Sequence, residues 1–216
     1  MLPVAVLISG RGSNLLAIHE ACERRAIDAR IVTVLTDRPG ALGLDRARER
    51  GLDAAAVPLA DYRDRTGRLD RTAFESELDA RIVASGAQLI VLAGFMRVLG
   101  AQFVARHIGR IVNIHPSLLP VYKGLHTHQR ALAAGDAFHG ASVHFVTAEL
   151  DGGPVIVQAK VPVLPGDSPT TLSDRVQARE HIIYPKVIGW IAEGRLKCVG
   201  GKPIMDGQPL SEPLQL

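Results

Sequence analysis

Long hydrophobic runs, cysteines and stacking aromatic residues are scarce in this chain of 216 residues. No apolar stretch approaches the roughly 18 residues that suggest a membrane span. The N-terminal MLPVAVLISGRGSN lacks the basic region and cleavage site of a signal peptide. The only cysteines, Cys22 and Cys198, match no disulfide or metal spacing, so we expect free thiols and a cytoplasmic location. Three tyrosines and one tryptophan argue against a nucleic-acid platform. With no long apolar run either, we expect neither nucleic-acid nor membrane partners.

The composition is that of an ordinary globular protein, with 47% hydrophobic and 22% charged residues, which excludes a disordered chain. Lys and Arg number 25 against 22 Asp and Glu, and the resulting net charge of +3 indicates no particular partner. At about 150 residues per domain, the length suits one large domain or two small ones.

Short β-branched runs alternate with helical patterns in the first half, as in βαβ units of a parallel sheet. We expect strands at 4–8, 31–35, 54–57, 89–92 and 111–114, and helices at 14–24, 42–50 and 72–85. Two further strands are expected at 141–146 and 154–163, before a long helix over about 170–193 and a polar tail. The sequence therefore predicts an α/β fold whose mainly parallel sheet gains antiparallel strands late in the chain.

A glycine-rich turn, Ser9-Gly10-Arg11-Gly12-Ser13-Asn14, joins the first expected strand to its helix. Glycines allow close approach of a ligand, and a helix N-terminus offers free N–H groups to an anion, so we predict a phosphate site here. The alternative is a tight turn with Ser13 as the helix N-cap. A dinucleotide site would require a third glycine where Leu15 stands. Asp37 lies where a ribose-binding acid would follow the second strand, although Asp-Arg-Pro-Gly is equally good turn chemistry.

The segment Asn-Ile-His-Pro-Ser-Leu-Leu-Pro, residues 113–120, lies at the end of the core strand expected at 111–114 and carries the clearest chemical signal. Ligands of open α/β sheets bind beyond the carboxyl ends of strands. Asn113 and His115, two residues apart, point to the same side of a strand. An amide donor beside an imidazole can stabilise an oxyanion while the histidine moves a proton. The alternative is a buried structural histidine.

Asp151 precedes two glycines in Leu-Asp-Gly-Gly-Pro, where little backbone crowding prevents its carboxylate from entering a cleft. A carboxylate near His115 would favour the imidazolium and raise its pKa. The alternative is an ordinary structural turn, and spacing alone does not place Asp151 near His115.

The remaining histidines are weaker candidates. His126 and His128 are two residues apart with no acidic or cysteine cluster beside them, so we expect a helix N-terminus or a loop contact and no metal. His144 alternates with apolar neighbours and faces either the core or the cleft. His19, His107 and His139 are expected on the surface or in packing. No Gly-x-Ser-x-Gly elbow supports a serine hydrolase.

Taken together and in order, these motifs resemble the folate-dependent formyltransferase family. The resemblance runs through SGRGSN, LAGFMRVL, NIHPSLLP, GLHTH, SVHFV, LDGGPV and RVQAREH, and it covers nearly the whole chain. It implies a Rossmann-like formyltransferase fold with helices on both faces of the sheet. We expect a single domain over 1–216, with a phosphate-binding half at 1–110, a catalytic and folate-binding half at 111–200 and a tail at 201–216. We expect neither the extra C-terminal nor the extra N-terminal domain of the family's tRNA formyltransferases and deformylases.

The resemblance implies formyl transfer from 10-formyltetrahydrofolate, a cosubstrate, to the amine of glycinamide ribonucleotide in purine biosynthesis, without a metal. Asn113 would stabilise the tetrahedral oxyanion, His115 would transfer a proton, and Asp151 would hold His115. Five residues resemble contacts to the ribonucleotide: Gly12, Ser13, Asn14, Gln177 and Glu180. The implied folate contacts are Arg71, Met96, Arg97, Val98, Leu99, Asn113, Thr147, Ala148, Glu149, Leu150 and Asp151.

Several alternatives stay open. Arg11 either contacts the phosphate or lies in solvent, and Arg71 aligns less firmly because its surroundings carry no motif. Within the family, another formyl acceptor such as an amino sugar competes with glycinamide ribonucleotide. Outside it, an NAD-dependent oxidoreductase or a non-catalytic nucleotide-binding module would explain the first turn alone. We expect small-molecule substrates and either a monomer or a homodimer.

Overall fold

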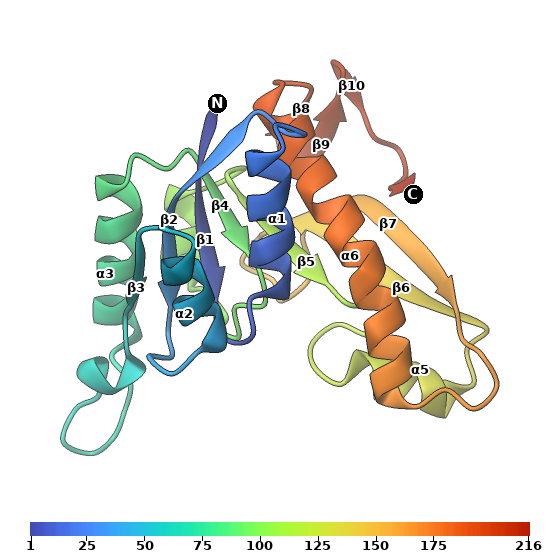
Figure 1. The fold of residues 1–216 in the computed structure, drawn as a ribbon, viewed down its shortest axis with the longest axis horizontal. Helices are drawn as coiled ribbons and strands as arrows, with labels where there is room; N and C mark the ends of the chain where they lie inside the picture. The colour runs from blue at the N-terminus through green and yellow to red at the C-terminus, as the bar shows by residue number, and fades with distance from the viewer. The chain divides into compact units, whose positions relative to one another are not determined.

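A computed structural model describes all 216 residues, which divide into two compact units, Met1–Ile111 and Val112–Leu216 (Figure 1). Each unit has its own strands, helices and buried residues, and each is described in turn.

Four parallel strands in the order β4-β1-β2-β3 form the centre of the first unit. They are β1 (Leu2–Ile8), β2 (Ala29–Thr36), β3 (Ala54–Ala56) and β4 (Leu89–Leu92). Val6 of β1 pairs with Val34 on one side and Val91 on the other. The run from Val4 to Ile8 is completely buried, as its continuous apolar character predicts. All four strands were predicted from the sequence, and their parallel pairing is confirmed.

The helices of the first unit are α1 (Ser13–Glu23), α2 (Leu42–Glu49), the 3₁₀ helix η1 (Leu59–Tyr62), α3 (Arg71–Ala84) and α4 (Ala101–Arg106). Both α1 and α2 lie beside β2 (Figure 1). Asp70 caps α3 by accepting a hydrogen bond from the Ala73 N–H, and the apolar stripe Phe74, Leu78 and Ile82 is buried. The short helix α4 was not predicted, because six residues show too little periodicity.

The second unit contains the antiparallel pairing that we predicted late in the chain. Its strands are β5 (Ile111–His115), β6 (Phe138–Phe145), β7 (Val155–Pro162) and β11 (Leu214–Gln215), in the order β11-β7-β6-β5. β6 is antiparallel to both β5 and β7. In this register Asn113 lies opposite His144, and His115 lies opposite Ser142. The pairing confirms the predicted α/β class with a late antiparallel part.

The 24-residue helix α6 (Pro169–Ala192) runs beside β6 and β7 (Figure 1). Ser168 and Thr171 form a capping box at its start, and Pro169 occupies the first turn, where it needs no N–H acceptor. The buried Tyr184 donates a hydrogen bond of 3.0 Å to the Val112 carbonyl of β5. A shorter helix, α5 (Thr127–Ala134), lies between β5 and β6 in the chain.

The chain after α6 carries regular structure that the sequence analysis did not anticipate. β8 (Leu196–Val199), β9 (Lys202–Met205) and β10 (Gln208–Pro209) form a separate antiparallel sheet. Gly200 and Gly201, both with positive φ, make the turn between β8 and β9. Arg195 binds both carboxylate oxygens of Asp206 at 2.8 Å, which joins the start of this sheet to its second turn. These strands are too short for an alternating pattern to reveal them. No helix in the structure is long and apolar enough to cross a membrane.

The turn between β1 and α1 depends on Gly12. Its φ is +73°, and a Cβ at this position would lie 2.8 Å from the Cα of Gly43. We therefore expect Gly12→Ala to lower the free energy of unfolding by about 1–3 kcal/mol, measured by urea denaturation. Gly10→Ala is the matched control, because a Cβ there meets open space and φ is ordinary. Equal midpoints for the two variants would contradict the prediction.

Candidate active site

The first βα turn presents an uncapped helix N-terminus. Gly12 is the N-cap of α1, and no side chain caps this end of the helix. The alternative with Ser13 as N-cap is therefore wrong, because Ser13 is already the first helical residue. Since no acidic residue occupies the first turn of α1, its N–H groups and the positive end of the helix dipole are suited to an anion.

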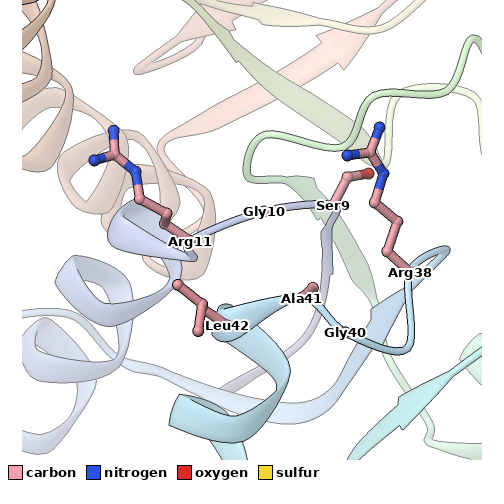
Figure 2. Close-up of a pocket in the computed structure, with 7 residues that line it drawn as sticks. All are labelled: Ser9, Gly10, Arg11, Arg38, Gly40, Ala41 and Leu42. Carbon is pink, nitrogen blue, oxygen red and sulfur yellow. The ribbon is translucent and has the colours of Figure 1, made fainter.

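A pocket of about 380 Å³ lies beside this turn, lined by Ser9, Gly10, Arg11, Arg38, Gly40, Ala41 and Leu42. Figure 2 shows the guanidinium groups of Arg11 and Arg38 on opposite sides of the Ser9–Gly10 backbone. Both side chains come from exposed residues, and Arg46 donates a hydrogen bond to the Arg11 carbonyl. The rim of the pocket is therefore positively charged.

Asp37 is not available to a ribose. Its side chain is fully buried, and its two oxygens accept hydrogen bonds from Ser9 Oγ at 2.5 Å and Arg97 Nε at 2.7 Å. A ribose-binding acid needs an accessible carboxylate, and Leu15 already removes the third glycine of a dinucleotide turn. Both features argue against the NAD-dependent alternative.

In the second unit, β5 carries Asn113 and His115 towards its carboxyl end, and His115 is buried. The ring of His115 lies between two hydrogen-bond acceptors. Its Nε2 is 2.9 Å from the Tyr122 carbonyl oxygen, and its Nδ1 is 3.5 Å from Asp151 Oδ2. A carbonyl oxygen only accepts, so Nε2 carries a hydrogen. The structure therefore brings Asp151 and His115 together, which the sequence spacing alone did not establish.

Asp151 lies in the turn between β6 and β7 with a left-handed backbone, φ 46°. Its carboxylate is 9% exposed, and Oδ2 accepts a hydrogen bond of 2.9 Å from the Gly124 N–H. Gly153 allows this turn to close, since a Cβ there would lie 1.8 Å from the Phe145 carbonyl oxygen. The second of the two glycines that follow Asp151 thus has a steric function.

His144 on β6 completes the cluster, and its hydrogen bonds define its tautomer. Nδ1 lies 2.9 Å from the Phe145 carbonyl oxygen, so Nδ1 carries the hydrogen. Nε2 is 3.1 Å from Asn113 Nδ2 and accepts from this amide. Burial lowers the pKa of His144, which favours this neutral form. The alternation around His144 left its direction open, and the antiparallel pairing with Asn113 decides it.

Several residues that support this cluster gave no signal in the sequence. Ser142 Oγ accepts from the Leu119 N–H and donates to the Ser117 carbonyl, and Gln158 Nε2 donates to the Leu119 carbonyl. These bonds hold the loop after His115 against β6 and β7. Their residues are ordinary strand and loop polar groups, so only the pairing of distant segments reveals them.

The histidines of the Gly-Leu-His-Thr-His segment begin a helix, as one of the two predicted possibilities stated. His126 is the N-cap of α5, and His128 Nδ1 lies 3.1 Å from Nε2 of the buried His139. His139 is thus a packing residue. Burial and the neighbouring His128 lower the pKa of His139 to about 4. No group of three or more His, Cys, Asp or Glu side chains could hold a metal ion.

The other predicted contacts occupy several parts of the two units. Gln177 and the buried Glu180 lie one turn apart on α6, so both lie on one face of this helix. Arg71 begins α3, and Met96, Arg97, Val98 and Leu99 belong to the loop between β4 and α4. Thr147, Ala148, Glu149 and Leu150 are exposed in the turn that leads to Asp151. Their roles as ligand contacts stay predictions.

Comparison with known proteins identifies the family. Residues 2–188 match the family described as formyl transferase. The chain belongs to the formyl transferase family. This formyl transferase is 51% identical over 207 residues to phosphoribosylglycinamide formyltransferase of Escherichia coli K12, which covers 96% of the chain and 95% of the relative. The structure of phosphoribosylglycinamide formyltransferase from Coxiella burnetii matches with a TM-score of 0.92 and 47% identity, covering 100% of this chain and 99% of that one.

A longer relative matches nearly the whole of this chain within a larger protein. The human trifunctional purine biosynthetic protein adenosine-3 is 38% identical over 194 residues, which is 90% of this formyl transferase and 19% of the human chain.

The low pKa of His139 predicts acid destabilisation. The unfolded state protonates its histidine near pH 6.5 and the folded state near pH 4, so the unfolded state binds more protons between these values. Stability should therefore fall as the pH drops below 6.5, by about 2 kcal/mol from this residue at pH 5. Urea denaturation at pH 7.5 and 5 measures the difference, and His139→Gln should reduce it. Replacement of the half-exposed His19 by Gln should not, and an undiminished fall in His139→Gln would refute the assignment.

Proposed function

We propose that the chain transfers the formyl group of 10-formyltetrahydrofolate to the amine of N1-(5-phospho-D-ribosyl)glycinamide, a step of purine biosynthesis. The observation that carries the proposal is the cluster of Asn113, His115 and Asp151 in a chain that matches phosphoribosylglycinamide formyltransferases over nearly its full length. The donor folate is a cosubstrate that leaves as tetrahydrofolate. The proposed reaction requires no metal.

The ribonucleotide phosphate binds the first turn of α1 through Gly12, Ser13 and Asn14, where the helix N-terminus is uncapped. Gln177 and Glu180 on α6 bind the rest of this substrate. The folate contacts are those named from the sequence, with the loop at 96–99 and the turn at 147–151 as their main parts. Met96 and Val98 are 53% and 51% exposed, which suits apolar contacts to an aromatic ligand.

The amine attacks the formyl carbon, and negative charge develops on the formyl oxygen. Asn113 Nδ2 donates to this oxyanion with the hydrogen that His144 does not accept. The proton lost by the amine returns to the folate nitrogen as its bond to the formyl carbon breaks, and His115 moves this proton. His115 acts through Nε2 once the hydrogen bond to the Tyr122 carbonyl is exchanged for one to substrate. Asp151 holds Nδ1 and stabilises the protonated ring.

The proposal predicts loss of activity when either His115 or Asp151 is changed. His115→Ala should lower kcat by about 10²–10⁴-fold, because it removes the proton-transfer group. Asp151→Asn should preserve folding and still slow turnover severely, since the neutral amide no longer stabilises the protonated ring. Formyl transfer to glycinamide ribonucleotide, measured with purified protein, checks both variants.

The controls separate this reaction from its alternatives. His19→Ala on α1 should retain full activity, and a reaction without acceptor measures hydrolysis by water. Hydrolysis that needs no acceptor would indicate a deformylase. Folate binding without transfer to glycinamide ribonucleotide would refute the proposed acceptor and favour another amine, such as an amino sugar.

His144 should affect kcat through the orientation of Asn113. His144→Leu removes the acceptor for Asn113 Nδ2, and we expect kcat to fall about tenfold, equivalent to one hydrogen bond. His144→Gln offers an amide oxygen instead and should retain more activity. Equal losses in the two variants, with equal thermal stability, would contradict a role through Asn113.

A further inference from the structure

We propose that Asp37 is a positioning residue for the folate-binding loop at 93–100, acting through Arg97 and Ser9. The inference rests on the proposed function, which assigns this loop to the folate. All residues involved lie in the first unit, at the carboxyl ends of the parallel strands β1, β2 and β4.

The carboxylate of Asp37 is fully buried at the end of β2, and each oxygen has a separate donor. Oδ2 accepts from Arg97 Nε at 2.7 Å, and Oδ1 accepts from Ser9 Oγ at 2.5 Å. Arg38 lies further away, with its Nε 4.0 Å from Oδ2. A buried carboxylate is costly unless it is hydrogen-bonded and paired, so the contact to Arg97 is the main compensation for the charge.

Ser9 transmits this contact to the backbone of the loop. Its hydroxyl donates to Asp37 and accepts from the Met96 N–H at 2.8 Å, and its own N–H donates to the Gly94 carbonyl at 3.1 Å. One carboxylate thus orients a side chain of the loop directly and its main chain through one hydroxyl.

The far end of the loop has an anchor of its own. Buried Glu75 of α3 accepts from the Gly100 N–H at 2.7 Å. Between these two anchors Met96 and Val98 expose their apolar side chains, and Arg97 remains 35% exposed although its Nε is bound to Asp37. The loop therefore presents apolar groups and a guanidinium in a conformation fixed before folate binds. Such preorganisation improves affinity because less freedom is lost on binding.

A carboxylate is better suited to this position than an amide. An asparagine side chain in place of Asp37 would have one acceptor oxygen for two donors, Arg97 Nε and Ser9 Oγ, and its NH₂ group would face one of them. The charge-assisted contact to Arg97 would also become a neutral one, and Arg97 would be free to leave its present orientation.

The test measures the dissociation constant of tetrahydrofolate by calorimetry, together with both KM values and kcat. Asp37→Asn should weaken tetrahydrofolate binding and raise the KM for the formyl donor about tenfold, while the KM for glycinamide ribonucleotide changes less than twofold. Arg97→Gln should give a similar loss for folate. If Asp37 acts through Arg97, the double variant should lose less affinity than the sum of the two single losses.

Glu20→Gln is the matched control, because it also removes one carboxylate that pairs with an arginine, Arg24, in the same unit. It should leave all these constants unchanged. Unchanged folate affinity in Asp37→Asn, additive losses, or equal weakening of both substrates with a lower melting temperature would each overturn the proposal. If Asp37→Asn does not fold, the same constants are compared for Ser9→Ala, Arg97→Gln and the double variant of these two residues. Tetrahydrofolate binding by the unchanged protein without formyl transfer would refute the proposed acceptor but leave the Asp37 test intact.

Discussion

The carboxylate of Asp151, which is only 9% exposed, is the group around which the cluster of the second unit is arranged. Its left-handed backbone and the missing Cβ of Gly153 close the turn between β6 and β7 at one position. The Gly124 N–H then fixes Oδ2, which faces Nδ1 of His115. Because a carboxylate with little exposure needs partners, the loop after β5 and the ring of His115 are constrained together. The cluster is therefore a product of local backbone geometry as much as of its side chains.

The first unit uses a similar arrangement for a different purpose. Asp37 also follows a strand and is also buried, but its partners are a hydroxyl and a guanidinium instead of an imidazole. A guanidinium keeps its proton at all ordinary pH values, so this pair holds a conformation and does not transfer a proton. The imidazole beside Asp151 can exchange one, which suits it to catalysis. The partner of each carboxylate thus determines whether the pair only holds a conformation or can also exchange a proton.

The hydrophobic periodicity of the sequence and the spacing of its residues were sufficient to predict the parallel strands, the long helix α6 and the placement of Asn113 and His115 on one strand. They were insufficient where contacts join distant segments. The approach of His144 to Asn113 follows from the antiparallel register of β5 and β6, and the approach of Asp151 to His115 depends on the turn after β6. No local pattern in the sequence places either contact. The sequence allowed Asp37 to be either a turn residue or a ribose ligand, because no sequence pattern reveals its burial and its ion pair with Arg97. The strands after α6 are too short to show an alternating hydrophobic pattern, so the sequence did not predict them.

Burial also affects the protonation of three histidines in the second unit. Desolvation lowers the pKa of His144, His139 and His128, so these rings are neutral at neutral pH. His144 then accepts from Asn113, which it could not do as an imidazolium. His115 has different partners, since its Nε2 faces a carbonyl oxygen and its Nδ1 faces a carboxylate. The same buried region therefore holds two imidazoles with different roles. His144 orients the Asn113 amide by accepting a hydrogen bond, and His115 is placed to donate one. Their different partners keep these roles distinct.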